Sequence, residues 1–153
     1  MFLKNSSELN YEFSNPKEFV YSYMDVNPEF KNSFSSLRII ESADKSFLDV
    51  KVRNIRKIQQ RHYKVRIFDP DLTKEIFAEL GHSVIMTFHK KRQTFCLGAI
   101  RLDLDDITEL GLFLEVKFKP DDKQKVEDII SSLGLKFTDM DSRSMMEIYL
   151  SKS

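Results

Sequence analysis

Two segments of the chain, 100–105 and 112–118, alternate in character and constrain the fold more than any other feature. Their apolar side chains share one face: Ile100, Leu102, Leu104, Leu112, Leu114, Val116 and Phe118. Most of the intervening positions are charged, and a period of two is typical of β-strands. The segments therefore predict two strands, each with an apolar face and a charged face. A charged face is often simply solvated, and the pattern alone leaves that alternative open.

Alternation and turn residues predict the remaining elements. Further strands are expected at 8–13, 36–40, 47–53, 59–68, 84–95 and 135–137. Helices are expected at 69–81 and 118–134, each followed by a glycine, and a short helix or turn is expected after 141–144. Asn15 before Pro16, together with the spacing of Phe19, Val20 and Tyr23, predicts another short helix over 16–27.

Composition favours one domain, 1–153, large enough for a real core. Lys+Arg and Asp+Glu both number 24, so net charge gives no reason to expect nucleic acid or an acidic membrane as the partner. The single cysteine, Cys96, excludes an intramolecular disulfide. Without a signal-peptide pattern or a run of transmembrane length, a cytoplasmic protein is expected.

Three motifs stand out in the second half of the chain: Lys90-x-Arg92-x-x-Phe95, Asp105-x-Ile107-x-x-Leu110-Gly111-x-Phe113-x-Glu115 and the segment 144–149. Together they resemble the motifs of the CYTH family, the triphosphate tunnel enzymes that include class IV adenylate cyclases and thiamine triphosphatases. The resemblance covers roughly 37–150. It implies an α+β fold, in which about eight strands form an antiparallel β-barrel or tunnel with helices packed outside.

In such a barrel the apolar faces pack against the helices, so the polar faces line the interior. The inward positions are then Glu8, Asn10, Glu12, Arg38, Asp49, Lys51, Arg53, Gln60, His62, Lys64, Arg66, Lys90, Arg92, Arg101, Asp103, Asp105, Phe113, Glu115 and Lys117. Basic residues outnumber acidic ones, and closely spaced cations need anions or carboxylates to offset their repulsion. A polyphosphate fits this lining, because arginine and lysine can bind it from several sides.

The resemblance also assigns roles to individual residues. Phosphate contacts fall to Arg38, Lys51, Lys90 and Arg92, which occupy the family's motif positions, and by strand parity alone to Lys64, Arg66 and Arg101. The catalytic candidates are Glu115 and Lys90. Mg²⁺ or Mn²⁺ would be held by Glu115 and Asp105, helped by Glu8 and Glu12.

The sequence departs from the family pattern at several places, and two of them bear directly on metal binding. Lys117 stands where the family carries a second glutamate, and the strand at 59–68 has no acidic residue. A basic strand such as 59–68 can simply face water, or it can supply direct cationic contacts in place of metal ligands. His62 on this strand could enter the tunnel and contact phosphate or act as a base; the alternative is an exposed histidine.

Three functions stay open from the sequence. The first is an enzyme that cyclises or hydrolyses a nucleoside or organic triphosphate. The second is a degenerate, non-catalytic protein that binds a nucleotide or another polyphosphate to sense or sequester it. The third is a structural or protein-binding barrel. The expected partner is a small polyphosphate, without nucleic acid or membrane, and the expected assembly is a monomer or homodimer.

Overall fold

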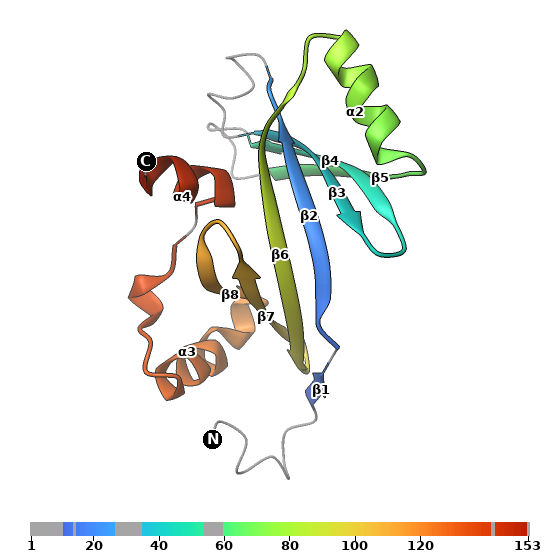
Figure 1. The fold of residues 1–153 in the computed structure, drawn as a ribbon. Coiled ribbons are helices and arrows are strands. Elements are labelled where there is room, and N and C mark those ends of the chain that lie inside the picture. The colour runs from blue at the N-terminus through green and yellow to red at the C-terminus, as the bar shows by residue number, and fades with distance from the viewer. Residues whose placement is uncertain (1–10, 14, 27–34, 54–59, 142, 153) are drawn as a thin grey trace. The chain divides into compact units, whose positions relative to one another are not determined.

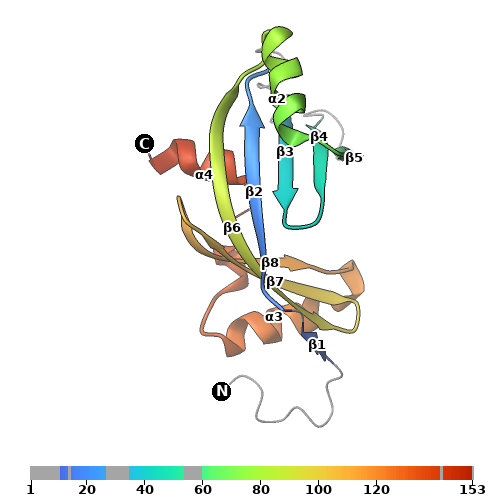
Figure 2. The same ribbon diagram turned by 45° about the vertical axis from the view of Figure 1, so that its right-hand side comes forward.

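A computed structural model describes residues 11–13, 15–26, 35–53, 60–141 and 143–152, with only the backbone described at 11–13 and 60. The chain divides into two compact units, Lys17–Lys90 and a second made of Met1–Pro16 and Lys91–Ser153. Figures 1 and 2 show their elements from two directions. Each unit is described by itself.

The unit Lys17–Lys90 is built on β2 (Lys17–Met24), β3 (Ser36–Ser42), β4 (Ser46–Arg53) and β5 (Gln60–Ile67). Adjacent strands of this set pair antiparallel. The strand order continues from β2 to β6 (Val84–Leu97), whose residues 84–90 belong to this unit. Figure 1 shows β2 running beside β6.

Strand register decides which side chains share a face, because directly paired residues point to the same side of a sheet. Tyr23 pairs with Arg38, Arg38 with Asp49, and Asp49 with Lys64. One row across four strands therefore carries two cations, one carboxylate and a phenol. This face is the one that the alternation predicted to be polar.

Helix α2 (Pro70–Glu79) packs against the opposite face of these strands. Asp69 caps its first turn by accepting a hydrogen bond from the Leu72 amide at 2.9 Å. Lys74 of α2 reaches Glu41 of β3 at 2.8 Å, and Glu41 alternates with Arg38 and Ile40 along β3. The ion pair therefore places α2 on the side of β3 opposite to Arg38.

The other unit contains residues 91–97 of β6, then β7 (Ile100–Ile107) and β8 (Gly111–Lys117), which pair antiparallel. Tight turns join these strands, and Gly98 and Gly111 adopt φ of 60° and 107°, where a side chain would be strained. The short strand β1 (Tyr11–Phe13) pairs with residues 95–97. The strands thus form a meander with β1 added beside β6.

The core of this unit lies between β7 and helix α3 (Lys123–Ser132), which follows the 3₁₀ turn η1 (Pro120–Asp122). Its buried residues are Ile100, Leu102, Val126 and Ile130. Burial of each such side chain contributes about 1.5–3 kcal/mol. The apolar face predicted for β7 is therefore the one that packs against the helix.

Helix α4 (Met145–Lys152) follows the 3₁₀ turn η2 (Phe137–Asp139). The Ser144 hydroxyl accepts a bond from the Glu147 amide at 3.2 Å, and the Glu147 carboxylate accepts one from the Ser144 amide at 2.6 Å. This reciprocal pair is a capping box. It confirms the helix start predicted after residues 141–144.

The antiparallel α+β fold is confirmed, and the described strands form one eight-stranded sheet in the order β5-β4-β3-β2-β6-β7-β8, with β1 on β6. The described strands leave this sheet open, with β5 and β8 at the two ends of its order, instead of closed into the predicted barrel. None of the helices in the described part of the chain is long and apolar enough to span a membrane.

Two element predictions are wrong. Residues 17–24 form strand β2 instead of a helix, and its last four residues, Tyr21 to Met24, are all buried. A strand buried on both faces has no apolar–polar alternation, so its aromatic spacing was misread as helical. Residues 135–137 were predicted as a strand, whereas the 3₁₀ turn η2 begins at Phe137. Leu133, the residue after α3, had the apolar spacing expected of a core residue, but it is 40% exposed.

Candidate polyphosphate-binding site

The polar face of the unit Lys17–Lys90 is rich in cations. We call it the cationic face and define it by Arg38, Lys51, Arg53, Lys64, Arg66 and Lys90, together with Asp49. Among the described residues paired across β3, β4 and β5, Asp49 is the one acid on this side. Among the described residues, positive charge is therefore in excess on this face.

Arg38 is the most constrained cation of this face. Its Nε donates to Asp49 Oδ2 at 2.6 Å and its Nη1 donates to the Tyr23 hydroxyl at 3.3 Å. Its guanidinium carbon lies 5.3 Å from the centre of the Tyr21 ring, within cation–π range. Burial alone would lower the pKa of Arg38, but Tyr23 and Asp49 outweigh it and raise this pKa. Arg38 is therefore charged and fixed in orientation.

Asp49 orients Arg38 from the neighbouring strand. Its side chain is fully buried, and its second oxygen, Oδ1, contacts His62 Nε2. Burial would raise the pKa of Asp49, but the charge of Arg38 and the hydrogen bonds from His62 and Arg38 lower it overall. Asp49 is therefore an ionised carboxylate that holds two basic side chains.

Lys90 brings a second buried cation to the cationic face. Its exposed fraction is 6%, and its Nζ lies 4.7 Å from the centre of the Tyr21 ring. On β5, Lys64 is exposed, with its Nζ 4.3 Å from the centre of the Phe47 ring. Aromatic rings thus support cations both in the buried part of the face and at its exposed edge.

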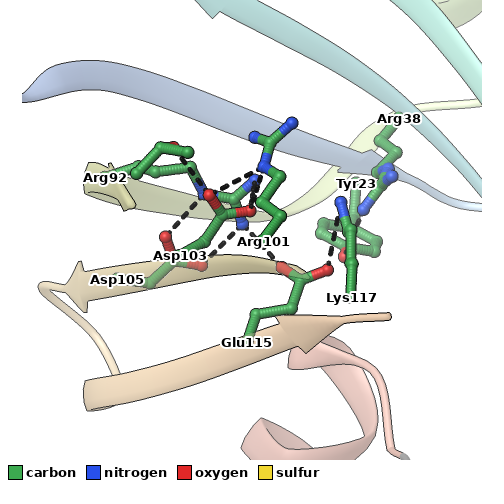
Figure 3. A network of polar contacts seen from close by, with 9 residues as sticks. Tyr23, Arg38, Arg92, Arg101, Asp103, Asp105, Glu115 and Lys117 are labelled. Atoms are coloured by element: carbon green, nitrogen blue, oxygen red, sulfur yellow. Dashed lines mark hydrogen bonds and ion pairs between the residues drawn. The ribbon is translucent and has the colours of Figure 1, made fainter. Parts of the chain in front are cut away.

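The polar face of the other unit carries a connected set of hydrogen bonds and ion pairs among described residues, which we call the Arg92 network. Its members are Arg92, Thr94, Arg101, Asp103, Asp105, Glu115 and Lys117, contributed by β6, β7 and β8. Figure 3 shows these side chains pointing toward one another.

Arg92 is the centre of this network. Its Nε and Nη2 donate to the two oxygens of Asp105 at 2.7 Å each, which is a bidentate pair. Nη2 also donates to Glu115 Oε2 at 2.7 Å, and Nη1 lies 3.2 Å from Asp103 Oδ2. One guanidinium therefore contacts three carboxylates.

Asp103 connects Arg92 to the rest of the network. The Thr94 hydroxyl donates to its Oδ1 at 2.6 Å, and Arg101 Nε donates to both oxygens at 2.9 and 3.0 Å. Burial would raise the pKa of Asp103, but these hydrogen bonds and the nearby charges of Arg92 and Arg101 lower it overall. The network is thus composed of ionised groups whose formal charges balance, three cations against three carboxylates.

The described side chains among the predicted metal ligands, Asp105 and Glu115, are not part of a metal site in the described residues. Among the residues that the structure describes, no three His, Cys, Asp or Glu side chains are arranged to hold a metal ion. Asp105 and Glu115 do lie together, but Arg92 bonds to both. Of the other predicted ligands, Glu8 lies outside the described residues, and Glu12 is paired with Cys96 in the β1–β6 register without a described side chain.

The structure divides the other predicted site residues between the two units. Arg38, Lys51, Lys64, Arg66 and Lys90 belong to the cationic face. Arg92, Arg101, Asp105 and Glu115 belong to the Arg92 network. That all these residues converge on one cavity stays a prediction, and so does each assigned role.

Two contributors were missed from the sequence. Tyr21 and Tyr23 fell on the wrongly predicted helix, although both touch Arg38. Read as a strand, residues 19, 21 and 23 share a face, and pairing with β3 brings that face to Arg38. The period-two alternation of aromatic residues was the signal that could have identified them.

Comparison with known proteins places the chain in a family. A family model described as the CYTH domain matches residues 2–145. The chain belongs to the CYTH domain family. This membership was predicted from its motifs, which lie on β6, on β7 and β8, and on α4.

CYTH relatives share both sequence and fold with the chain. A Methanocaldococcus jannaschii protein named "Putative adenylate cyclase" is 26% identical over 130 residues, 82% of this chain and 74% of that protein. A conserved hypothetical protein from Pyrococcus furiosus matches 96% of this chain and 91% of its own, with a TM-score of 0.72 and 25% identity.

A more distant CYTH-like structure shows the fold alone. It is that of a Hippeastrum protein described as a "Putative adenylyl cyclase" with a dominant triphosphatase activity. It matches 99% of this chain and 89% of its own length, at a TM-score of 0.69 and 17% identity.

Proposed function

We propose that the chain binds the triphosphate group of a nucleotide or another small polyphosphate on its cationic face, and converts it by hydrolysis or by cyclisation. CYTH membership supports the ligand class. The observation that carries the proposal is the charge of the face, six lysines and arginines with a single aspartate. A linear polyphosphate carries several charges in a row and matches such a surface.

Arg38 and Lys90 are the central phosphate ligands in this proposal. Because Asp49 and Tyr23 fix the guanidinium of Arg38, little side-chain entropy is lost when it binds an anion. Lys90 is buried against Tyr21, and a cation with little access to water interacts more strongly with phosphate. Lys51 and Lys64, less buried than Lys90, would bind the outer phosphates.

Asp49 and His62 act on the ligand through orientation and charge. The two oxygens of Asp49 contact Arg38 and His62. Asp49 therefore orients these two basic side chains, and its own negative charge is offset by them. The His62 side chain is 46% exposed beyond this contact. It is therefore placed to donate a hydrogen bond to a phosphate oxygen when it is protonated.

The two reactions are taken from the printed descriptions of related proteins, adenylate cyclase and triphosphatase. CYTH family enzymes generally use divalent metals, which polarise the phosphoryl group and orient the attacking oxygen. Asp105 and Glu115, the predicted metal ligands with described side chains, are bonded to Arg92. We therefore assign no step to metal. Glu115 and Lys90 remain the predicted catalytic residues. The cytoplasmic location is also a prediction, as is the monomeric or dimeric state.

The second candidate function is binding without turnover. It is favoured by the bonds from Arg92 to Asp105 and Glu115, the two described carboxylates that were expected to hold metal. Under this alternative the cationic face still binds polyphosphate, and the protein senses or sequesters it.

Calorimetric titration of ATP and of inorganic tripolyphosphate, with EDTA and then with Mg²⁺ or Mn²⁺, tests both candidates. Chromatography of the same samples would reveal cyclic nucleotide, ADP or pyrophosphate. Binding with product supports the enzyme, and binding without product under any metal condition supports the binder. The proposed function is wrong if neither ligand binds to the wild-type protein. It is also wrong if Lys90→Met lowers the affinity no more than Lys91→Met does at the adjacent exposed position.

A further inference from the structure

We propose that Arg92 is a built-in counter-ion that closes Asp105 and Glu115 to divalent metal ions. The proposal concerns the metal-binding capacity of the protein alone. It is therefore independent of whether the cationic face binds polyphosphate.

The first argument is the coverage of the carboxylate oxygens. Arg92 lies 2.7 Å from Oδ1 and Oδ2 of Asp105 and from Oε2 of Glu115. The remaining oxygen, Glu115 Oε1, lies 3.4 Å from Lys117 Nζ. Each of the four oxygens therefore faces a cationic nitrogen in the described structure.

The second argument is electrostatic. A divalent ion binds carboxylate oxygen at about 2.0–2.6 Å, so it would lie within a few ångströms of the Arg92 guanidinium. Asp105 and the Arg92 side chain are only 3% and 12% exposed, and like charges repel strongly where water is scarce. Metal and Arg92 therefore compete for the same oxygens.

The third argument is that Arg92 cannot easily move aside. It also lies 3.2 Å from Asp103, whose carboxylate is fully buried and is held by Thr94 and Arg101. If Arg92 left, a buried carboxylate would lose one of its counter-charges, which is unfavourable. Asp103 is thus a third carboxylate that holds Arg92 in place. A metal ion at Asp105 and Glu115 must displace this fixed cation.

Titration with Mn²⁺ alone, followed by electron paramagnetic resonance, tests the proposal. Wild-type protein should bind Mn²⁺ weakly at this position, and Arg92→Gln should bind it at least about tenfold more tightly, because the repulsive cation is gone. The gain should disappear in Arg92→Gln/Asp105→Asn, which removes a ligand as well. Arg143→Gln is the matched control, since Arg143 pairs with Asp141 in the same unit at an exposed position.

A second variant keeps the test decisive if Arg92→Gln does not fold. Lys117 is 54% exposed, so Lys117→Gln should fold normally, and it uncovers Oε1 of Glu115. We expect it to increase Mn²⁺ affinity by about two- to threefold, the size of a surface charge effect. The proposal is overturned if no folded variant of Arg92 or Lys117 gains affinity, or if wild-type protein binds Mn²⁺ tightly and loses it in Asp105→Asn.

Discussion

The cationic face and the Arg92 network are built from similar residues but have opposite charge balance. In the Arg92 network each arginine bonds to carboxylates, and cations and carboxylates are equal in number. On the cationic face Asp49 is the single acid among six lysines and arginines. Paired opposite charges stabilise a fold, whereas an excess of one sign among the described residues attracts ions of the opposite sign.

The largest expected effect is loss of the central arginine of the balanced network. Arg92→Met removes the bidentate partner of buried Asp105 and one of the counter-charges of buried Asp103, which should reduce the free energy of unfolding by about 3–5 kcal/mol. Urea denaturation followed by circular dichroism measures this. Arg101→Met is the matched control. Because Arg101 is 45% exposed, this substitution should reduce the free energy of unfolding by about 1 kcal/mol or less. Equal effects of the two variants would contradict the buried role of Arg92.

The next largest effect should fall on ligand binding at the cationic face. Lys90→Met keeps the length of the side chain and removes its charge, so it should weaken tripolyphosphate binding by about 10- to 100-fold, the value of one charge-assisted hydrogen bond of about 1.5–3 kcal/mol. Isothermal titration calorimetry measures the affinity, and Lys91→Met on the exposed next position is the control. If Arg92→Lys weakens binding more than Lys90→Met does, the division between the two regions does not hold.

Acid should lower the stability of both regions, as the lowered pKa values of one aspartate in each region predict. The pKa values of Asp49 and Asp103 are lowered from the ordinary value of 3.8 in the folded protein, so the unfolded chain binds protons more readily. Their contribution to stability is complete above pH 3.8 and is lost as the pH falls through the folded-state values. Thermal unfolding between pH 2 and pH 6 should show the loss. Asp103→Asn should flatten the acid limb; an unchanged limb would exclude Asp103 as its cause.

The smallest effect is expected for an ion pair outside both regions. Asp141 bonds to Arg143 at the surface, and hydrogen bonds from Arg143 lower the pKa of Asp141 to about 2. Solvent screens such exposed pairs, so Asp141→Asn should leave the melting temperature unchanged within error at neutral pH. A carbon-detected NMR titration should still show the low pKa of Asp141 in the wild-type protein. A clear drop in melting temperature would mean that surface pairs contribute as much as the buried network.

Much of the fold was predictable because most strands have one covered face. In β4 and β7, apolar and polar residues alternate, and the structure confirms both strands. Strand β2 is buried on both sides over Tyr21 to Met24, so it lacks apolar–polar alternation, and only the period-two spacing of Phe19, Tyr21 and Tyr23 indicated a strand. Single-sequence reasoning therefore fails where tertiary contacts cover both faces.

The candidate site was predictable as a set of residues but not as a set of pairs. Parity alone placed cations and carboxylates on the polar faces of their strands. It could not show that Arg92 bonds to Asp105 and Glu115, 13 and 23 residues away. Partner choice depends on the register of β6, β7 and β8, and on which oxygens the guanidinium reaches. That information lies in the packing of the strands.

The tight turns of the β6-β7-β8 meander also have a consequence for the order of folding. Its hairpins turn at Gly98 and just before Gly111, so these strands meet after closing very short loops. Pairing of β2 with β6 closes a loop of about 60 residues, which has a larger entropic cost. We expect the meander to gain amide protection first in pulsed hydrogen exchange, with β2 joining late. Early protection of β2 would contradict this order; late joining would make the assembly of the cationic face the slow step in the maturation of the protein.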